Sequence, residues 1–249
     1  MARKNKKLIA IIILLIGLFF LLGESPDNSK FKEVLNSVSE NEIVIIFNSG
    51  GWGDTPIEEA ADFTPIINGI QKTLSDLGRN SIVIPYIRTK ESFLGRIEGV
   101  KEILGLFPKQ SQKLSNEIEY FIKNHPENKI IMAGLSNGGI FVNRTMMKIS
   151  ETKKNSVFAI EIGIPFWENV LKFDNVLLLN NKGKDALFEM DLKTLVWAFL
   201  KAPYQWFLAQ ILREELSFSQ ALYLPGHYYS WDNVASEVKF FLENRFVLF

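Results

Sequence analysis

The sequence predicts an α/β fold built on a doubly wound, mostly parallel sheet of about six strands. Short apolar runs rich in Ile, Val and Leu recur along the chain, without the polar alternation of a half-exposed strand. Such runs are typical of strands that are buried on both faces of a parallel sheet. Segments with the apolar spacing of amphipathic helices separate the runs, and this alternation predicts parallel strands joined by helical crossovers.

Each predicted strand corresponds to one of these continuous apolar runs. They cover 43–47, 81–86, 129–133, 156–165 with its exit, 175–180 and 221–224. Helices are predicted over 63–77, 110–124, 140–149 and 234–246, and a loop and helix over 88–107. A long, aromatic helical insertion, from 188 to about 215, precedes the last strand and is expected to be broken near Pro203. Its aromatic side chains are expected to line an acyl pocket, to rest on a bilayer, or simply to pack on the sheet.

The composition argues against nucleic-acid binding, cysteine chemistry and multi-histidine metal sites. The 249 residues are enough for one domain with a full core, and 28 basic residues balance 28 acidic ones. This balance does not favour a nucleic-acid partner. The chain has no cysteine, which excludes disulfides, thiolate catalysis and cysteine-based zinc sites. With only two histidines, a multi-histidine metal centre is not expected either, so the prediction includes no metal and no cofactor.

The amino-terminal segment has the pattern of a membrane-targeting sequence. Four basic residues lie within 1–7, and 8–22 is apolar throughout apart from Gly17. We expect 1–23 to form an uncleaved membrane anchor, with membrane contact through 8–22, or a cleaved signal peptide. The basic flank predicts a domain on the extracytoplasmic side, or a secreted one after cleavage. Residues 24–41 are predicted to be a stalk, linker or short leading helix, and 42–249 the folded domain.

The third predicted strand ends in Gly134-Leu135-Ser136-Asn137-Gly138. A serine in a Gly-x-Ser-x-Gly sequence between a strand and a helix sits on a sharp turn that exposes its hydroxyl. The two glycines leave room for this backbone, where a Cβ would clash. Ser136 is therefore the candidate nucleophile.

A serine nucleophile needs a general base, and the base needs an orienting carboxylate. His227 follows the last predicted strand and is the candidate base, since histidine exchanges protons near neutral pH. His125 precedes the strand that leads to Ser136, so we expect it in a surface loop at the other end of the sheet. Asp185 follows a strand and is the preferred acid, although it also fits as a cap of the helix that follows. Asp54 is the second candidate, and helix capping would explain it as well.

The developing oxyanion of acyl transfer needs preorganised hydrogen-bond donors. The amide of Asn137, directly after the candidate nucleophile, is one candidate. The glycine-rich turn after the first strand, residues 48–54, offers the amide of Trp52 or Gly51 as the second. The competing interpretation of this turn is a phosphate-binding loop, but it lacks both the Gly-x-Gly-x-x-Gly spacing and the Lys-Ser/Thr of a P-loop.

These motifs together resemble the α/β-hydrolase superfamily over about 42–249. The residues that carry the resemblance are Gly134–Gly139, the turn 48–54, Asp185 in Asn-Lys-Gly-Lys-Asp, and Pro225-Gly226-His227. Their order along the chain, serine, aspartate and then histidine, is the order of that superfamily. The sequence departs from it in two ways: the usual histidine of the oxyanion turn is replaced, and the two antiparallel strands that often open the fold are not visible.

The resemblance implies an α/β-hydrolase-like sheet, trimmed at its start, and a cofactor-free hydrolase that forms an acyl-serine intermediate. Ser136 would attack, His227 would shuttle the proton and Asp185 would hold the imidazolium. The first hypothesis is a serine hydrolase of the esterase, lipase or thioesterase type that cleaves small-molecule or lipid carboxylic esters. Two alternatives stay open: a non-catalytic hydrolase-fold protein that binds a ligand or partner at the membrane, and a serine acyltransferase.

Overall fold

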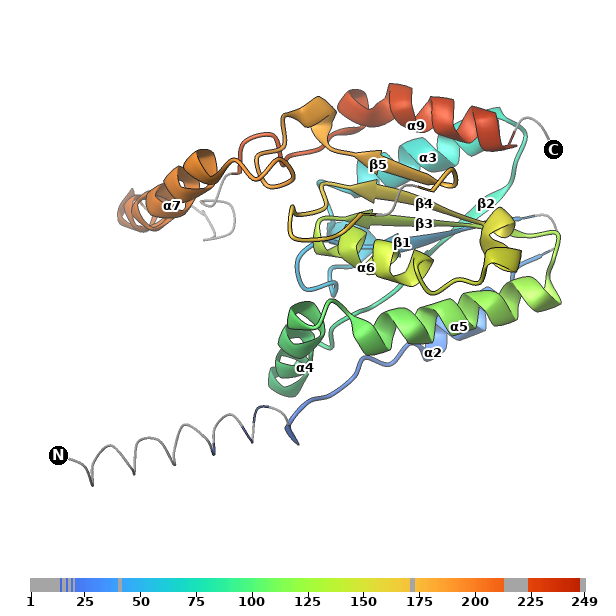
Figure 1. Ribbon diagram of the computed structural model, residues 1–249, viewed down its shortest axis with the longest axis horizontal. Coiled ribbons are helices and arrows are strands. Elements are labelled where there is room, and N and C mark those ends of the chain that lie inside the picture. Colours follow the sequence, from blue (N-terminus) through green and yellow to red (C-terminus); the bar gives the residue numbers. More distant parts are fainter. Residues whose placement is uncertain are drawn as a thin grey trace.

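The computed structural model describes residues 14, 17, 19, 21–39, 42–170, 173–212 and 224–246. In this part of the chain a single parallel sheet has the strand order β2-β1-β3-β4-β5. The strands are β1 (Ile43–Asn48), β2 (Ser81–Pro85), β3 (Lys129–Leu135), β4 (Val157–Ile162) and β5 (Val176–Leu179). The predicted doubly wound α/β fold is thereby confirmed (Figure 1).

The sheet has five strands where about six were predicted. The strand predicted over 221–224 is the one without a counterpart: residues 221–223 lie outside the described part of the chain, and Leu224 belongs to no strand. β2 ends at Pro85, as expected for a residue that has no amide hydrogen to continue the ladder.

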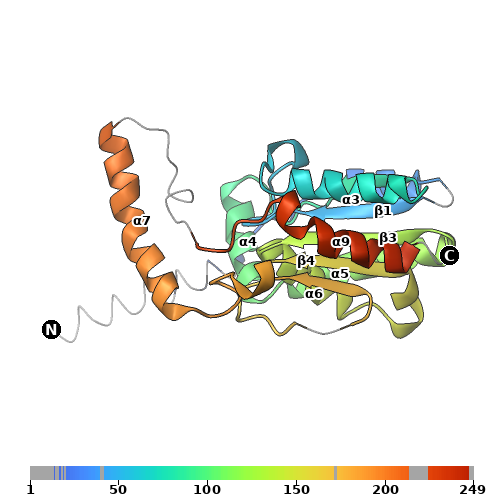
Figure 2. The ribbon, with the colours of Figure 1, turned by 90° about the horizontal axis from the view of Figure 1, so that it is seen from above.

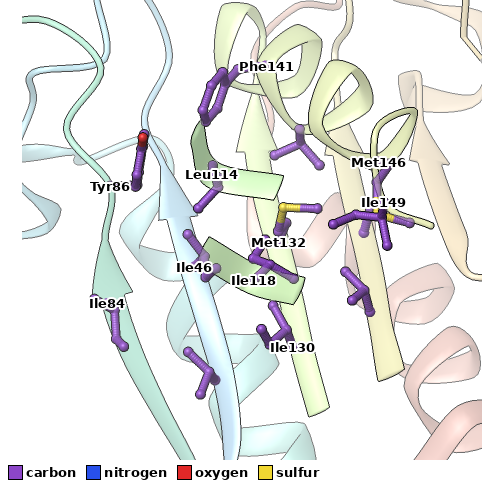
Figure 3. Close-up of a cluster of buried hydrophobic side chains, with 14 of the residues drawn as sticks. Ile46, Ile84, Tyr86, Leu114, Ile118, Ile130, Met132, Phe141, Met146 and Ile149 are labelled. Atoms are coloured by element: carbon purple, nitrogen blue, oxygen red, sulfur yellow. The ribbon is translucent and has the colours of Figure 1, made fainter. Parts of the chain in front are cut away.

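Helices cover both faces of the sheet (Figures 1 and 2). One face carries α2 (Ser29–Asn36), α4 (Phe93–Leu104), α5 (Pro108–Asn124) and α6 (Asn137–Met146), and the other carries α3 (Thr64–Asp76) and α9 (Trp231–Phe246). All residues of β1 and β4 are buried, so two hydrophobic layers form. Val44 and Ile46 of β1 belong to the layer under α5 and α6, shown in Figure 3, whereas Ile45 and Phe47 belong to the opposite layer.

Helix α2 lies in the segment predicted to be a stalk, linker or short leading helix. Its Phe31 and Leu35 are almost completely buried and are part of the core under α5 and α6. The ring of Phe31 meets the ring of Tyr86 edge to face, with the centroids 5.1 Å apart. This helix therefore packs as part of the folded body.

The prediction of a transmembrane anchor needs correction. In the described residues, no helix is both long enough and apolar enough to cross a membrane. Most of the segment predicted to contact the membrane, 8–22, lies outside those residues.

The described part of the helical insertion contains helix α7 (Leu192–Leu212), which projects away from the sheet (Figures 1 and 2). It continues through Pro203, so the predicted break at this residue is wrong. Its aromatic side chains are largely exposed rather than packed on the sheet, among them Trp197, Phe199 and Phe207. Residues 213–215 of the predicted insertion are outside the described part.

Glu161 is a carboxyl group inside the core. It lies on β4 opposite Gly134 of β3 and has no exposed surface. In the described part of the chain, neither of its carboxylate oxygens has a hydrogen-bond partner. Burial, reinforced by the charge of Glu168, raises the pKa of Glu161 well above its ordinary value. Burial in the folded protein therefore favours the neutral form of this side chain over the charged form.

We predict that Glu161 makes the protein less stable as the pH rises. Above the ordinary pKa of a glutamate, the unfolded chain loses this proton while the folded chain keeps it, so the free energy of unfolding falls with pH until the raised pKa is reached. Glu161→Gln cannot ionise and should flatten this fall by up to about 1.4 kcal/mol per pH unit. Urea unfolding between pH 5 and 8 measures both slopes. Glu243→Gln, an exposed change on α9, should keep the wild-type slope, and equal slopes in all three proteins would contradict the prediction.

Candidate active site

Ser136 occupies the sharp turn between β3 and α6. Its φ of 53° and ψ of −116° are rare for a residue with a side chain, and its hydroxyl makes no capping bond to the helix. The neighbouring glycines have no room for a side chain. A Cβ on Gly134 would overlap the carbonyl oxygen of Gly138, and a Cβ on Gly138 would overlap the carbonyl oxygen of Asn48. The predicted elbow is thus present and packs against the end of β1.

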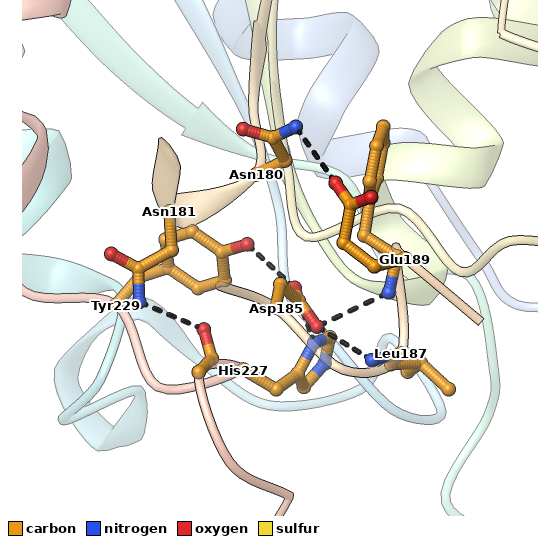
Figure 4. A network of polar contacts seen from close by, with 9 residues as sticks. Asn180, Asn181, Asp185, Leu187, Glu189, His227 and Tyr229 are labelled. Carbon is orange, nitrogen blue, oxygen red and sulfur yellow. Dashed lines mark hydrogen bonds and ion pairs between the residues drawn. The ribbon is translucent and has the colours of Figure 1, made fainter. Parts of the chain in front are cut away.

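His227 and Asp185 come together from loops on either side of the insertion. Nδ1 of His227 lies 2.9 Å from Oδ2 of Asp185 (Figure 4). The approach depends on Gly226, whose φ is 76° and where a Cβ would overlap the carbonyl oxygen of Lys184. The amide of Ala186 donates to the carbonyl oxygen of Pro225 at 3.1 Å and ties the two loops together.

Both oxygens of the Asp185 carboxylate are fully bonded. The hydroxyl of Tyr229 donates to Oδ2 at 2.6 Å, beside His227, and the amides of Leu187 and Phe188 donate to Oδ1 at 2.9 and 3.2 Å. Asp185 therefore contacts the imidazole of His227 and also caps the following turn. Burial alone would raise the pKa of Asp185, but the hydrogen bonds from His227 and Tyr229 outweigh it, so the pKa lies below its ordinary value. The side chain is an anion at neutral pH.

Ser136 and His227 line one cavity of about 430 Å³. The turn after β1 also lines this cavity, with Ser49, Gly50, Gly51 and Trp52. The chain leaves β1 toward β2 on one side and reaches β3 on the other, so the cavity lies at the point where the strand order reverses, the usual ligand site of open α/β sheets. Within the described residues no hydrogen bond joins Ser136 to His227, and such bonds often tighten only when substrate is present.

Of the predicted oxyanion residues, Gly51 and Trp52 line the same cavity, and Asn137 directly follows Ser136. The amide of Asn137 is the first of α6, where no intrahelical acceptor exists. Its side-chain amide donates to the carbonyl oxygen of Gly51 at 3.2 Å and so joins the elbow to the turn. The carbonyl of Trp52 accepts from the hydroxyl of Thr89 at 2.6 Å, and the indole ring lies under the guanidinium of Arg96.

The two other candidate residues, Asp54 and His125, bond or pack against partners other than Ser136, His227 and Asp185. The carboxylate of Asp54 borders the cavity but pairs with Arg96 at 2.6 Å, so it neither contacts His227 nor caps a helix as predicted. His125 stacks on Phe121 at the end of α5, before β3 begins. Among the described residues, no three His, Asp or Glu side chains are grouped closely enough to hold a metal ion.

Two residues that border the site were not identified from the sequence. Tyr229 is not among the residues that the sequence assigns to the site, and Arg88 enters only as the first residue of a predicted loop. A signal exists for both, because Tyr229 lies two residues after the candidate base and Arg88 follows the end of β2, at the strand edge where the other candidates lie. Neither position reveals the direction of its side chain.

The close contact at the elbow leads to a stability prediction. Gly138→Ala should lower the free energy of unfolding by about 1–3 kcal/mol, since the new Cβ would meet backbone atoms of β1 that have no room to move. Gly139→Ala is the matched control, because its Cβ would meet the side chain of Ile164, 2.8 Å away, which has more freedom to shift. Denaturant unfolding of the two variants tests this order, and an equal or larger loss in Gly139→Ala would contradict it.

Comparisons with known proteins identify the fold. No family model matches the chain, and no curated protein matches it in sequence. Among solved structures, a Trichoderma reesei cutinase in complex with a phosphonate inhibitor is similar over 88% of this chain and 85% of that chain, with 13% identity and a TM-score of 0.50. A cutinase-like protein from a Cryptococcus species is similar over 82% of this chain and 95% of that chain, with 14% identity and a TM-score of 0.46. At such identity the likeness to the Trichoderma cutinase concerns the fold alone, and it shows that this chain has the α/β-hydrolase fold that its sequence predicts.

Proposed function

We propose that the protein is a serine hydrolase that cleaves carboxylic esters through an acyl-serine intermediate. The observation that carries this proposal is the pair of His227 and Asp185, 2.9 Å apart, at the cavity that Ser136 borders from its strained turn. The fold supports it, because the similar Trichoderma cutinase was solved with a phosphonate inhibitor, a class of compound that reacts with nucleophilic serines.

In the acylation step, Nε2 of His227 accepts the hydroxyl proton of Ser136 while Oγ attacks the ester carbonyl carbon. Asp185 accepts the hydrogen of Nδ1, which leaves Nε2 free as the base and stabilises the imidazolium that forms. The tetrahedral intermediate collapses to the acyl-serine, and the leaving alcohol takes its proton from Nε2. A water molecule then repeats the sequence on the acyl-serine and releases the carboxylic acid.

The negative oxygen of the tetrahedral intermediate needs donors near Ser136. We assign the first to the amide of Asn137 and the second to the amide of Gly51. The carbonyl of Gly50 accepts a hydrogen bond from the amide of Gly53 at 3.0 Å inside the turn. The carbonyl of Gly50 and the amide of Gly51 belong to one trans peptide, so the amide hydrogen of Gly51 points away from Gly53. The amide of Trp52 is less suitable, because the carbonyl of its peptide faces the side chain of Asn137.

Labelling with a fluorophosphonate tests the nucleophile. The full chain should be labelled at Ser136, and Ser136→Ala should abolish both labelling and the release of p-nitrophenol from p-nitrophenyl butyrate. His227→Ala should lower kcat by at least about 10³-fold, because the base is lost. Ser150→Ala, far from the cavity, serves as the control and should behave as wild type. A folded wild-type protein that is neither labelled nor active would refute the proposal in favour of a non-catalytic binding protein.

The hydroxyl of Tyr229 should contribute to the rate through Asp185. Tyr229→Phe removes a charge-assisted hydrogen bond that fixes Oδ2 of Asp185 beside His227, so the carboxylate should hold the imidazole less firmly in the orientation that acylation needs. Such a bond contributes about 1.5–3 kcal/mol, so kcat should fall by roughly 10- to 100-fold with little change in KM.

The neighbouring Tyr228→Phe is the matched control for this change. Tyr228 is exposed and makes no hydrogen bond through its hydroxyl in the described residues, so its variant should keep the wild-type kcat. Equal kcat values for the two phenylalanine variants would contradict the role of Tyr229.

A further inference from the structure

The guanidinium of Arg88 is buried directly behind the turn after β1. Only 1% of the residue is exposed, and its charged group lies over the rings of Phe107 and Phe141, 5.1 and 5.7 Å from their centroids. It presses against Gly53, where a Cβ would overlap the guanidinium atoms, and the φ of 75° at this glycine turns the chain around it. This arrangement places a positive charge beside the glycine-rich turn.

Arg88 bonds backbone carbonyls and not a carboxylate. Its Nη2 donates to the carbonyl oxygen of Ser49 and lies 3.5 Å from that of Gly50, and its Nη1 lies 3.4 Å from that of Asn137. In the described part of the chain it forms no ion pair, since the nearby Asp54 is bonded to Arg96. Burial lowers the pKa of Arg88 to about 9, which still leaves it charged at neutral pH.

The carbonyls that Arg88 holds determine where the amides of the turn point. In a trans peptide the carbonyl and the amide hydrogen point in opposite directions. With the carbonyls of Ser49 and Gly50 toward Arg88, the amides of Gly50 and Gly51 point away from it. Both residues line the cavity with Ser136, and neither amide has an acceptor among the residues that the structure describes.

A cation in this place costs stability. Burying a charge without an opposite charge is unfavourable, and an apolar side chain would fill the space between Phe107 and Phe141 without that penalty. The bonds of Arg88 go to the two segments, the turn and the start of α6, that supply the candidate oxyanion donors. A role in the site would explain why a charged side chain and not an apolar one occupies this position.

We propose that Arg88 is a positioning residue of the oxyanion site: it holds the turn 49–53 against α6 so that the Gly50 and Gly51 amides face the reacting carbonyl, and it places a positive charge behind them. This role rests on the proposed ester hydrolysis. It differs from a purely structural role, because it predicts an effect on the charged transition state and not on substrate binding.

Kinetics of Arg88 variants test the role. With p-nitrophenyl butyrate, and with kcat normalised to the sites labelled by fluorophosphonate, Arg88→Met should lower kcat about 10²-fold and leave KM within about threefold. Arg88→Lys keeps the charge and should recover part of the loss, more than the neutral Arg88→Gln does. If Arg88→Met does not fold, the difference in kcat between Arg88→Lys and Arg88→Gln tests the role in its place.

The matched control is Arg79→Met. The guanidinium of Arg79 also bonds a backbone carbonyl, that of Phe246, but it lies between α3 and β2, at the opposite end of the sheet from Ser136. This variant should lower Tm and keep kcat. Unchanged kcat in all folded Arg88 variants would overturn the proposed role of Arg88 while leaving the hydrolase proposal intact.

A spectroscopic measurement separates the oxyanion effect from general loosening. A trifluoromethyl ketone should add to Ser136 as a hemiketal, whose hydroxyl ionises to an oxyanion in the site. Titration by ¹⁹F NMR should show the pKa of this hydroxyl raised by about one unit or more in Arg88→Met relative to wild type and to Arg79→Met. An unchanged value would overturn the role, and a wild type that neither adds the ketone nor hydrolyses the ester would refute it together with the proposed function.

Discussion

Helix α6 begins so close to the end of β1 that no side chain fits between them. Gly138 faces the carbonyl oxygens of Asn48 and Ser49, and Gly134 faces the carbonyl oxygen of Gly138. This backbone contact forces Ser136 into its strained turn and, at the same time, seats the glycine-rich turn beside it. The candidate nucleophile and the candidate oxyanion donors therefore have their relative positions set by one packing constraint, which the pairing of Asn48 with Gly134 in the sheet establishes.

Two buried charges of opposite sign support this arrangement from different sides. Asp185 is anionic because His227, Tyr229 and two backbone amides bond it, and it faces the imidazole. Arg88 is cationic, enclosed by Phe107 and Phe141, and faces the carbonyls of the turn. In acyl transfer a positive charge develops on the histidine and a negative one on the carbonyl oxygen. Each buried charge thus lies on the side where the opposite charge would form.

The parallel sheet explains how residues distant in the chain meet. All strands end at the same edge, so the turn after β1, the elbow after β3 and the loop after β5 come together there, and the loop before α9 returns to that edge. Helix α7, by contrast, projects from this body (Figure 2). Its aromatic side chains are exposed. The machinery of the proposed reaction is therefore contained in the sheet and its loops.

The sequence by itself determined the parallel α/β architecture, the elbow at Ser136 and the choice of His227 as the candidate base, because apolar runs, glycine spacing and the scarcity of histidine are local or compositional signals. Only the tertiary structure decided that Asp185 and not Asp54 contacts His227, that Tyr229 and Arg88 border the site, and that α7 continues through Pro203. These features depend on where loops and side chains meet across the fold, through contacts between residues far apart in the chain. Residue type and spacing show which residues reach the edge of the sheet, but not which of them bond there.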